Sequence, residues 1–345
     1  MAYTDIDKPT DYFNTVLYTG NGSTQSITGV GFQPDWVWIK GRSSAVNHNL
    51  WDVIRGTTKY LISNNTGSEN TDATLFNSFN SDGFTVGNGG IVNDSGVTYV
   101  GWCWKANGSG SSNTDGSITS TVSANTTSGF SIVSYTGTGS ASTVGHGLGS
   151  VPACYFIKQR NTTGGWIVYH QGNTSAPETE YLRLDKDDST VDDAIFNDTL
   201  PTSSVFSIGT NAPVNTSSGT YIAYCFAEKK GFSKFGSYTG NGSSDGAFIY
   251  TGFKPAMIII KKTNGVEEWG IYDNKRDPFN VADHRLFPNL SDSESTTTDM
   301  LDFTSNGFKC RTSNNMVGAS GGEYIYMAFA ENPFVTSTGI PGLAR

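Results

Sequence analysis

The chain has 345 residues and a net charge of −9 at pH 7. Its 22 basic residues are scattered, which argues against a nucleic-acid partner. No apolar run approaches the roughly 18 residues that a membrane span needs, so we also expect no membrane insertion. Gly is frequent at 41 residues and charged residues make up only 15%. This composition favours short strands and polar turns over helices.

The first 14 residues contain Pro9 and show no periodicity, so we expect an extended N-terminal arm. The segment that begins at Met1 has neither a basic stretch nor an apolar core. It therefore does not read as a signal peptide.

A pattern of about ninety residues then occurs three times. Each copy opens on Tyr-Thr-Gly, continues through a Pro into an apolar run that ends in Lys, and closes on a strand led by Tyr. The openings lie at Tyr18, Tyr135 and Tyr238, the apolar runs at Pro34–Lys40, Pro152–Lys158 and Pro255–Lys261, and the closing strands at Tyr99, Tyr221 and Tyr324. A position needed for packing should recur in all copies, whereas a single active site should not.

The pattern divides the chain into six segments. We predict an arm at 1–14, copy one at 15–106, a linker at 107–128, copy two at 129–228, copy three at 229–332 and a C-terminal tail at 333–345. The linker consists almost wholly of Gly, Ser, Asn and Thr, so we expect it to be mobile unless it docks on a neighbour.

Each copy is expected to be nearly all strand. The runs after the Pro are apolar on both faces, which is typical of central strands. Asp82-Gly83 and Asn306-Gly307 supply the positive φ of tight hairpins. The closing strands alternate large and small side chains. Together these features predict an all-β protein of three tandem β-sandwich domains, similar to jelly rolls, with the extended arm and tail at its ends.

Three strings carry a resemblance to a known family: Tyr18–Ser23, Gln33–Lys40 and Tyr324–Phe334. They resemble a repeated domain of uncharacterised function in virion and tail-associated proteins of tailed phages, especially marine ones. The resemblance implies a virion structural protein made in the host cytoplasm, such as a tail-fibre or capsid-decoration component with a role in host attachment. It implies other virion proteins and further copies of the chain as partners, with a trimer expected by analogy alone. It supplies no catalytic residues.

The motifs for enzymatic chemistry are weak. Gly318–Gly322 matches G-x-S-x-G, but a strand follows it where the nucleophile elbow requires a helix, so we interpret it as a turn. The four His residues, at 48, 146, 170 and 284, form no i, i+4 pair, and no P-loop is present. A depolymerase would need two carboxylates across a cleft, and no acidic pair recurs in all copies. We therefore predict that the protein is not an enzyme.

Cysteine and acidic residues bear on metal binding. Cys103 and Cys225 occupy the place of Ala328, which favours small buried residues over disulfides or metal ligands. An acidic stretch contains Asp185, Asp187, Asp188, Asp192 and Asp193. The matching loops hold Glu69 and Asp72 in copy one, and Asp292, Glu294 and Asp299 in copy three. We favour a solvated loop and keep loop-bound Ca²⁺ as the alternative; no other cofactor is expected.

The tryptophans fall into two groups. Trp36, Trp38, Trp102 and Trp104 lie on strands where the other copies have other large side chains, which predicts core positions. Trp51, Trp166 and Trp269 each follow the Lys of the apolar run by 8–11 residues. They are either plugs between sheets, which we favour, or a repeated contact surface. A repeated contact surface would support an alternative function, that of a carbohydrate-binding adhesin that recognises host surface glycan.

Overall fold

The computed structural model describes residues 3–296, 298 and 300–341. The fold is all-β, with several sheets. Among these residues, helix is confined to five short pieces: η1 (Pro9–Asp11), α1 (Gly90–Asn93), η2 (Pro177–Thr179), η3 (Ala194–Phe196) and α2 (Ala212–Asn215). Within the described part of the chain, no helix has the length and apolar character of a membrane span.

We call residues 13–104 unit one; they form two sheets. The larger sheet has the order β1-β9-β3-β4-β5-β6 and the smaller one β2-β8-β7. The strands are β1 (Phe13–Thr19), β2 (Gln25–Thr28), β3 (Trp36–Gly41), β4 (Asn49–Asp52), β5 (Gly56–Ile62), β6 (Asn70–Thr71), β7 (Phe76–Asn80), β8 (Gly83–Val86) and β9 (Thr98–Trp104). All six residues of β3 are buried, because strands flank it on both sides and the sheet is covered on both faces.

Unit two, residues 111–226, has the larger sheet β10-β11-β12-β19-β14-β15-β16-β17 and the smaller sheet β13-β18. Its strands are β10 (Ser111–Asn113), β11 (Ser120–Asn125), β12 (Phe130–Thr136), β13 (Ser142–Gly145), β14 (Cys154–Gln159), β15 (Trp166–His170), β16 (Glu180–Arg183), β17 (Val191–Asp192), β18 (Val205–Ile208) and β19 (Thr220–Phe226). The strand after the Pro, β14, is again buried throughout.

Unit three, residues 233–333, has the sheets β20-β26-β22-β23 and β21-β25-β24. Its strands are β20 (Ser233–Thr239), β21 (Phe248–Tyr250), β22 (Phe253–Lys262), β23 (Gly270–Asp273), β24 (Leu301–Thr304), β25 (Gly307–Cys310) and β26 (Glu323–Pro333). The predicted central strands and the hairpins β7–β8 and β24–β25 are thus confirmed.

The larger sheets share one order of four strands: the opening strand, the closing strand, the strand after the Pro, and the next. The tyrosine near the end of each opening strand and the tyrosine near the start of each closing strand are direct cross-strand partners in every unit. Their rings stack, with centroids 5.1, 5.0 and 5.0 Å apart in units one, two and three. These pairs fix the register of each larger sheet.

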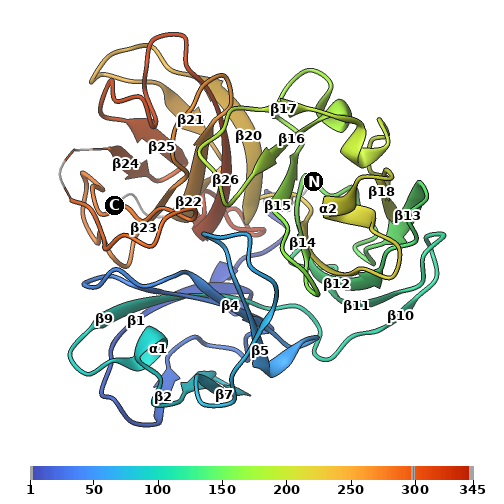
Figure 1. Cartoon of the computed structure of the whole chain (residues 1–345). Coiled ribbons are helices and arrows are strands. Elements are labelled where there is room, and N and C mark those ends of the chain that lie inside the picture. Colours follow the sequence, from blue (N-terminus) through green and yellow to red (C-terminus); the bar gives the residue numbers. More distant parts are fainter. Residues whose placement is uncertain (1–2, 297, 299, 342–345) are drawn as a thin grey trace.

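Each larger sheet has two buried faces. One face packs on the smaller sheet of its own unit, and the other packs at the centre of the molecule in a single hydrophobic cluster fed by all three units. Figure 1 shows the three lobes around this common centre, with unit one in blue to cyan, unit two in green to yellow and unit three in orange to red. One face of each closing strand, which includes Trp102, Tyr224 or Met327, lies in the central cluster.

Trp36 shows how the central cluster joins the units. Its ring lies 4.4 Å from Trp104 of its own unit and 4.4 Å from Tyr224 of unit two, measured between centroids. The core role predicted for Trp36, Trp38, Trp102 and Trp104 is confirmed, since all four are buried. What they fill is the space between units, and burying indole rings there contributes several kcal/mol of cohesion.

Both connecting segments dock on the units. Residues 107–128, predicted to form a linker that is mobile unless it docks, contain β10 and β11, and β11 pairs with β12 over five residues. Val122 of this segment is buried in the core of unit two and anchors it there. The N-terminal arm also packs on the molecule: Ile6 lies in the central cluster, and Asp7 accepts hydrogen bonds from Ser337 of the tail.

Candidate functional site

Polar groups gather where two units meet. We call these places the one–two, two–three and three–one junctions. At each, the Lys that ends the apolar run donates to backbone oxygens of the preceding unit: Lys158 to Thr66 at 3.1 Å, Lys261 to Asp187 at 3.0 Å and Lys40 to Ser291 at 3.2 Å. The three junctions therefore close a ring. Burial lowers the pKa of each of these Lys residues to about 8.

The candidate contact residues Trp51, Trp166 and Trp269 are all buried, so they form no surface. Two of them fill space between neighbouring units. Trp166 donates through Nε1 to Ile62 of unit one at 2.8 Å, and Trp269 donates to Arg183 of unit two at 2.9 Å.

Trp51 is not the counterpart of the other two. It pairs with Val37 inside unit one and stacks on Phe76. His48 holds the matching place, since it lies eight residues after Lys40, as Trp166 does after Lys158. Trp38 donates to His48 at 2.9 Å, so the smaller imidazole accommodates the extra indole of unit one.

The one–two junction contains a buried ion pair. Arg55 donates through Nε to Asp52 at 2.5 Å, and both side chains are fully buried. Tyr224 of unit two donates to the same carboxylate at 2.7 Å. Glu69 lies 3.6 Å from Arg55 and accepts a hydrogen bond of 2.8 Å from Arg160 of unit two. Each buried charge therefore has partners from both units, as buried charges require.

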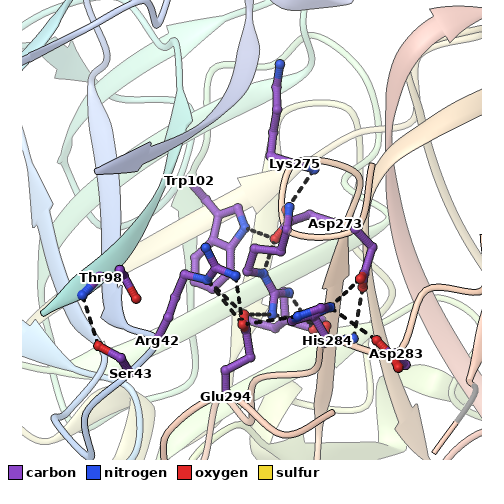
Figure 2. Close-up of polar contacts among 12 residues, drawn as sticks. Arg42, Ser43, Thr98, Trp102, Asp273, Lys275, Asp283, His284 and Glu294 are labelled. Atoms are coloured by element: carbon purple, nitrogen blue, oxygen red, sulfur yellow. Dashed lines mark hydrogen bonds and ion pairs between the residues drawn. The ribbon is translucent and has the colours of Figure 1, made fainter. Parts of the chain in front are cut away.

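The three–one junction repeats this network with different residues (Figure 2). Arg276 donates to Asp273 at 2.6 Å, and Trp102 of unit one donates to the same carboxylate at 3.0 Å. Glu294 accepts from Arg276 at 3.1 Å and from Arg42 of unit one at 2.8 Å. Burial opposes the ionisation of Glu294, but Arg42 and Arg276 outweigh it and lower its pKa.

The two–three junction is neutral at the matching places. His170 replaces the Asp, and burial lowers its pKa to about 4. Asn173 replaces the Arg, and Thr190 donates to it at 2.7 Å. Thr190 and Thr263 take the places of the outer Glu and Arg and are joined only through the backbone, at 2.9 Å. A polar cleft of about 760 Å³ lies beside these residues.

One polar cluster belongs to a single junction. Asp277, Asp283 and His284 follow β23 at the three–one junction (Figure 2). His284 Nδ1 faces Asp277 Oδ1 in a close contact and lies 3.1 Å from Asp283 Oδ1. Burial raises the pKa of Asp277, against the influence of His284 and Arg276. Sequence reasoning missed this cluster because it searched His residues only for His partners.

The acidic stretch of unit two does not gather into a site. Asp185 accepts the Trp166 backbone N–H at 2.6 Å, Asp188 pairs with Arg183, and Asp193 accepts from Asn211 at 2.9 Å. Asp187 contributes its backbone oxygen to Lys261, and the side chain of Asp192 is exposed. The carboxylates therefore point to separate partners, which gives no support to loop-bound Ca²⁺. Asp299 of unit three lies outside the described residues.

Two further predictions about sequence motifs are confirmed. Gly318–Gly322 is a turn that leads into β26. Cys103 and Cys225 are buried, and burial raises the pKa of both thiols. Neither thiol is accessible to solvent.

One surface cleft is lined by aromatic residues. It has a volume of about 490 Å³ and lies between the arm, the segment that connects units two and three, and β21 of unit three. Tyr3 and Tyr250 line it with exposed rings, beside Asp5, Glu228 and Lys234. Flat aromatic rings next to carboxylates are a surface that can stack on and hydrogen-bond to a polar ring.

Comparison with known proteins identifies one family that matches the chain. The family described as a domain of unknown function (DUF7483) matches residues 8–333. None of the curated proteins compared with the chain matches it.

Proposed function

The chain belongs to the DUF7483 family, whose function is unknown, and we propose that this member is a non-enzymatic structural component of a phage virion. We further propose that its three units are copies of one β-sandwich. The shared strand order, the three stacked tyrosine pairs and the three junction lysines support the second proposal. The virion role itself derives from the resemblance to tail-associated phage proteins.

One observation carries the structural role. The charged residues at the junctions are buried, and their hydrogen bonds connect one unit to the next. These groups therefore serve cohesion within the ring. The result is a rigid body that presents polar loops outward, which suits a particle component acting through contacts with other virion proteins and with copies of itself.

Immunogold electron microscopy tests the virion assignment. An antibody against the chain is applied to purified particles of the phage that encodes it. We expect gold on the tail, the fibre or the capsid surface, with particles lacking the protein as the control. Absence of gold from intact particles, with the chain present in the infected-cell lysate, would contradict the proposal.

Glycan binding is the second candidate, and the cleft at Tyr3 and Tyr250 favours it. We expect host polysaccharide to bind there by stacking on the tyrosines. Because all seven tryptophans are buried, calorimetry is a better readout than tryptophan fluorescence. Tyr250→Ala should weaken binding at least tenfold, whereas Phe248→Ala on the same strand serves as a matched control. Absence of heat at millimolar sugar would exclude this function.

A further inference from the structure

Equivalent positions of the three junctions can be compared, and the comparison singles out Asp277, Asp283 and His284 as specific to the three–one junction. In each unit a leucine pairs with the strand that follows the apolar run, at the same register position: Leu61 with β4, Leu182 with β15 and Leu286 with β23. These leucines align the residues that precede them in the three units. Two residues before each leucine stand Lys59, Glu180 and His284, and three before stand Thr58, Thr179 and Asp283.

His284 thus occupies the place of a fixed cation. Lys59 Nζ lies 4.0 Å from Glu69 in the one–two junction, and His284 Nε2 lies 3.8 Å from Glu294 in the three–one junction. Asp277, directly after the buried Arg276, stands where unit one has Gly56. Unit three has therefore lost a lysine and gained two carboxylates at this place.

The exchange changes the charge of the ion-pair network. The one–two network joins three cations to two carboxylates: Arg55, Lys59 and Arg160 against Asp52 and Glu69. The three–one network joins two guanidiniums to four carboxylates: Arg42 and Arg276 against Asp273, Asp277, Asp283 and Glu294. In the second network the carboxylates therefore outnumber the guanidiniums by two.

We propose that Asp277, Asp283 and His284 form a binding site for a divalent transition-metal ion, with Zn²⁺ as the best-fitting probe. Their ligand atoms lie within 4.8 Å of one another, close enough to surround one ion after small side-chain adjustments. One ion of charge +2 offsets the excess of two carboxylates. Within the described residues this is the one group of three such ligands that the structure brings together.

The ligand atoms select the class of metal. The set combines an imidazole nitrogen with carboxylate oxygens, which suits Zn²⁺ and its first-row neighbours better than Ca²⁺, an ion that prefers oxygen alone. Binding through Nδ1 leaves the imidazole proton on Nε2, which lies 3.8 Å from the Glu294 carboxylate. Asp277 Oδ2 accepts the His284 backbone N–H at 2.9 Å, which orients the carboxylate.

The site is open enough to fill. Asp277 is 6% exposed, whereas Asp283 and His284 are 31% and 32% exposed, so an ion can enter from the solvent side. A bound ion would tie the loop of unit three to the Glu294 segment, which in turn holds Arg42 of unit one. The metal would therefore strengthen the closure of the ring.

Calorimetric titration of the full chain, freed of metal with EDTA, tests the site. We expect one Zn²⁺ per chain with a Kd in the micromolar range or below, and far weaker binding of Ca²⁺ and Mg²⁺. Saturating Zn²⁺ should raise Tm by roughly 3–6 °C. Co²⁺ in the site should show visible absorption bands without thiolate charge transfer.

The matched variant restores the unit-one residues. Asp283→Thr with His284→Lys recreates Thr58 and Lys59 and should weaken Zn²⁺ binding by about 100-fold. Asp283→Asn alone, a milder change, should weaken it about tenfold, and Asp187→Asn in unit two should leave it unchanged. Circular dichroism of each variant serves to verify that it is folded. A wild-type chain that binds no Zn²⁺, or a double variant that binds it as tightly as wild type, overturns the proposal.

Discussion

The charged and neutral junctions solve the same packing problem in different ways. At the one–two junction, Asp52 and Arg55 are fully buried and Tyr224 of the next unit completes their hydrogen bonds. At the two–three junction, His170 and Asn173 hold the same places without charge. The charged residues are replaced by neutral ones as a group, because a single buried charge without its partner would destabilise the fold.

The comparison shows which interactions cohesion requires. The junction lysines and the central aromatic cluster occur at all three interfaces, whereas the Asp–Arg pairs occur at two. The ring therefore does not need the ion pairs for its geometry. A buried ion pair restricts which side chain the neighbouring unit can place against it, and loss of either partner lowers the free energy of unfolding.

The largest expected effect comes from breaking one ion pair. Arg55→Met leaves Asp52 buried without its cation, and we expect the free energy of unfolding to fall by about 3–5 kcal/mol. Arg276→Met should behave alike, because Asp273 keeps the Trp102 donor and two backbone N–H donors but loses its cation. Urea unfolding followed by circular dichroism measures the change.

The neutral junction provides the control for this experiment. Asn173→Met removes an amide that accepts one side-chain hydrogen bond, so we expect a loss of about 1 kcal/mol. Equal losses at the charged and neutral junctions would contradict the view that the ion pairs carry a separate penalty. All variants should unfold in one transition, since the central cluster couples the three units.

The second prediction concerns what the junctions share. The three junction lysines have a pKa of about 8 in the folded chain, against 10.5 for an ordinary Lys. Above pH 8 the unfolded chain holds more protons at these sites than the folded chain does. These lysines should therefore raise the free energy of unfolding with pH, by about 3 kcal/mol between pH 8 and 9 before the opposing thiols are counted.

The window ends near pH 9 because buried thiols act in the opposite direction. Burial raises the pKa of Cys103, Cys154 and Cys225 above the ordinary 9.0, which favours the unfolded chain at higher pH. Lys158→Met should remove about 1 kcal/mol of the rise between pH 8 and 9, whereas Lys105→Met should leave the rise unchanged. A flat or falling free energy of unfolding in wild type over this interval would refute the assignment.

Much of the fold follows from local sequence. The tyrosine-led strands and the runs after each Pro have alternating or continuous apolar patterns, and these reflect burial within one unit. The sequence could not predict what the second face of each larger sheet packs against, because Trp36 contacts Tyr224 and Trp104 contacts Phe329 across units. Such contacts leave no periodic signal in the sequence.

The site was harder to predict for a related reason. Trp51 was grouped with Trp166 and Trp269 by approximate spacing, yet the register places it three residues beyond the matching position. The equivalence of His284 with Lys59 depends on loops of different length that converge on Leu61 and Leu286. Only strand pairing fixes that equivalence, although the adjacent Asp283-His284 was visible as a ligand pair.

The smallest expected effect comes from giving the neutral junction an ion pair. Thr263 corresponds to Arg42 and Arg160, and Thr190 corresponds to Glu294 and Glu69, because the same backbone hydrogen bond joins each pair. Thr263→Arg with Thr190→Glu should add about 0.5–1 kcal/mol to the free energy of unfolding, as expected of a half-exposed pair.

A double-mutant cycle separates the new pair from the side effects of each change. Thr190→Glu alone should destabilise the chain, since it replaces the hydroxyl that donates to Asn173. Thr263→Arg alone should be nearly neutral, because its side chain can reach solvent through the adjacent cleft. A coupling energy near zero would mean that the charged and neutral junctions differ in backbone geometry as well as in side chains, and that residue exchange cannot convert one into the other.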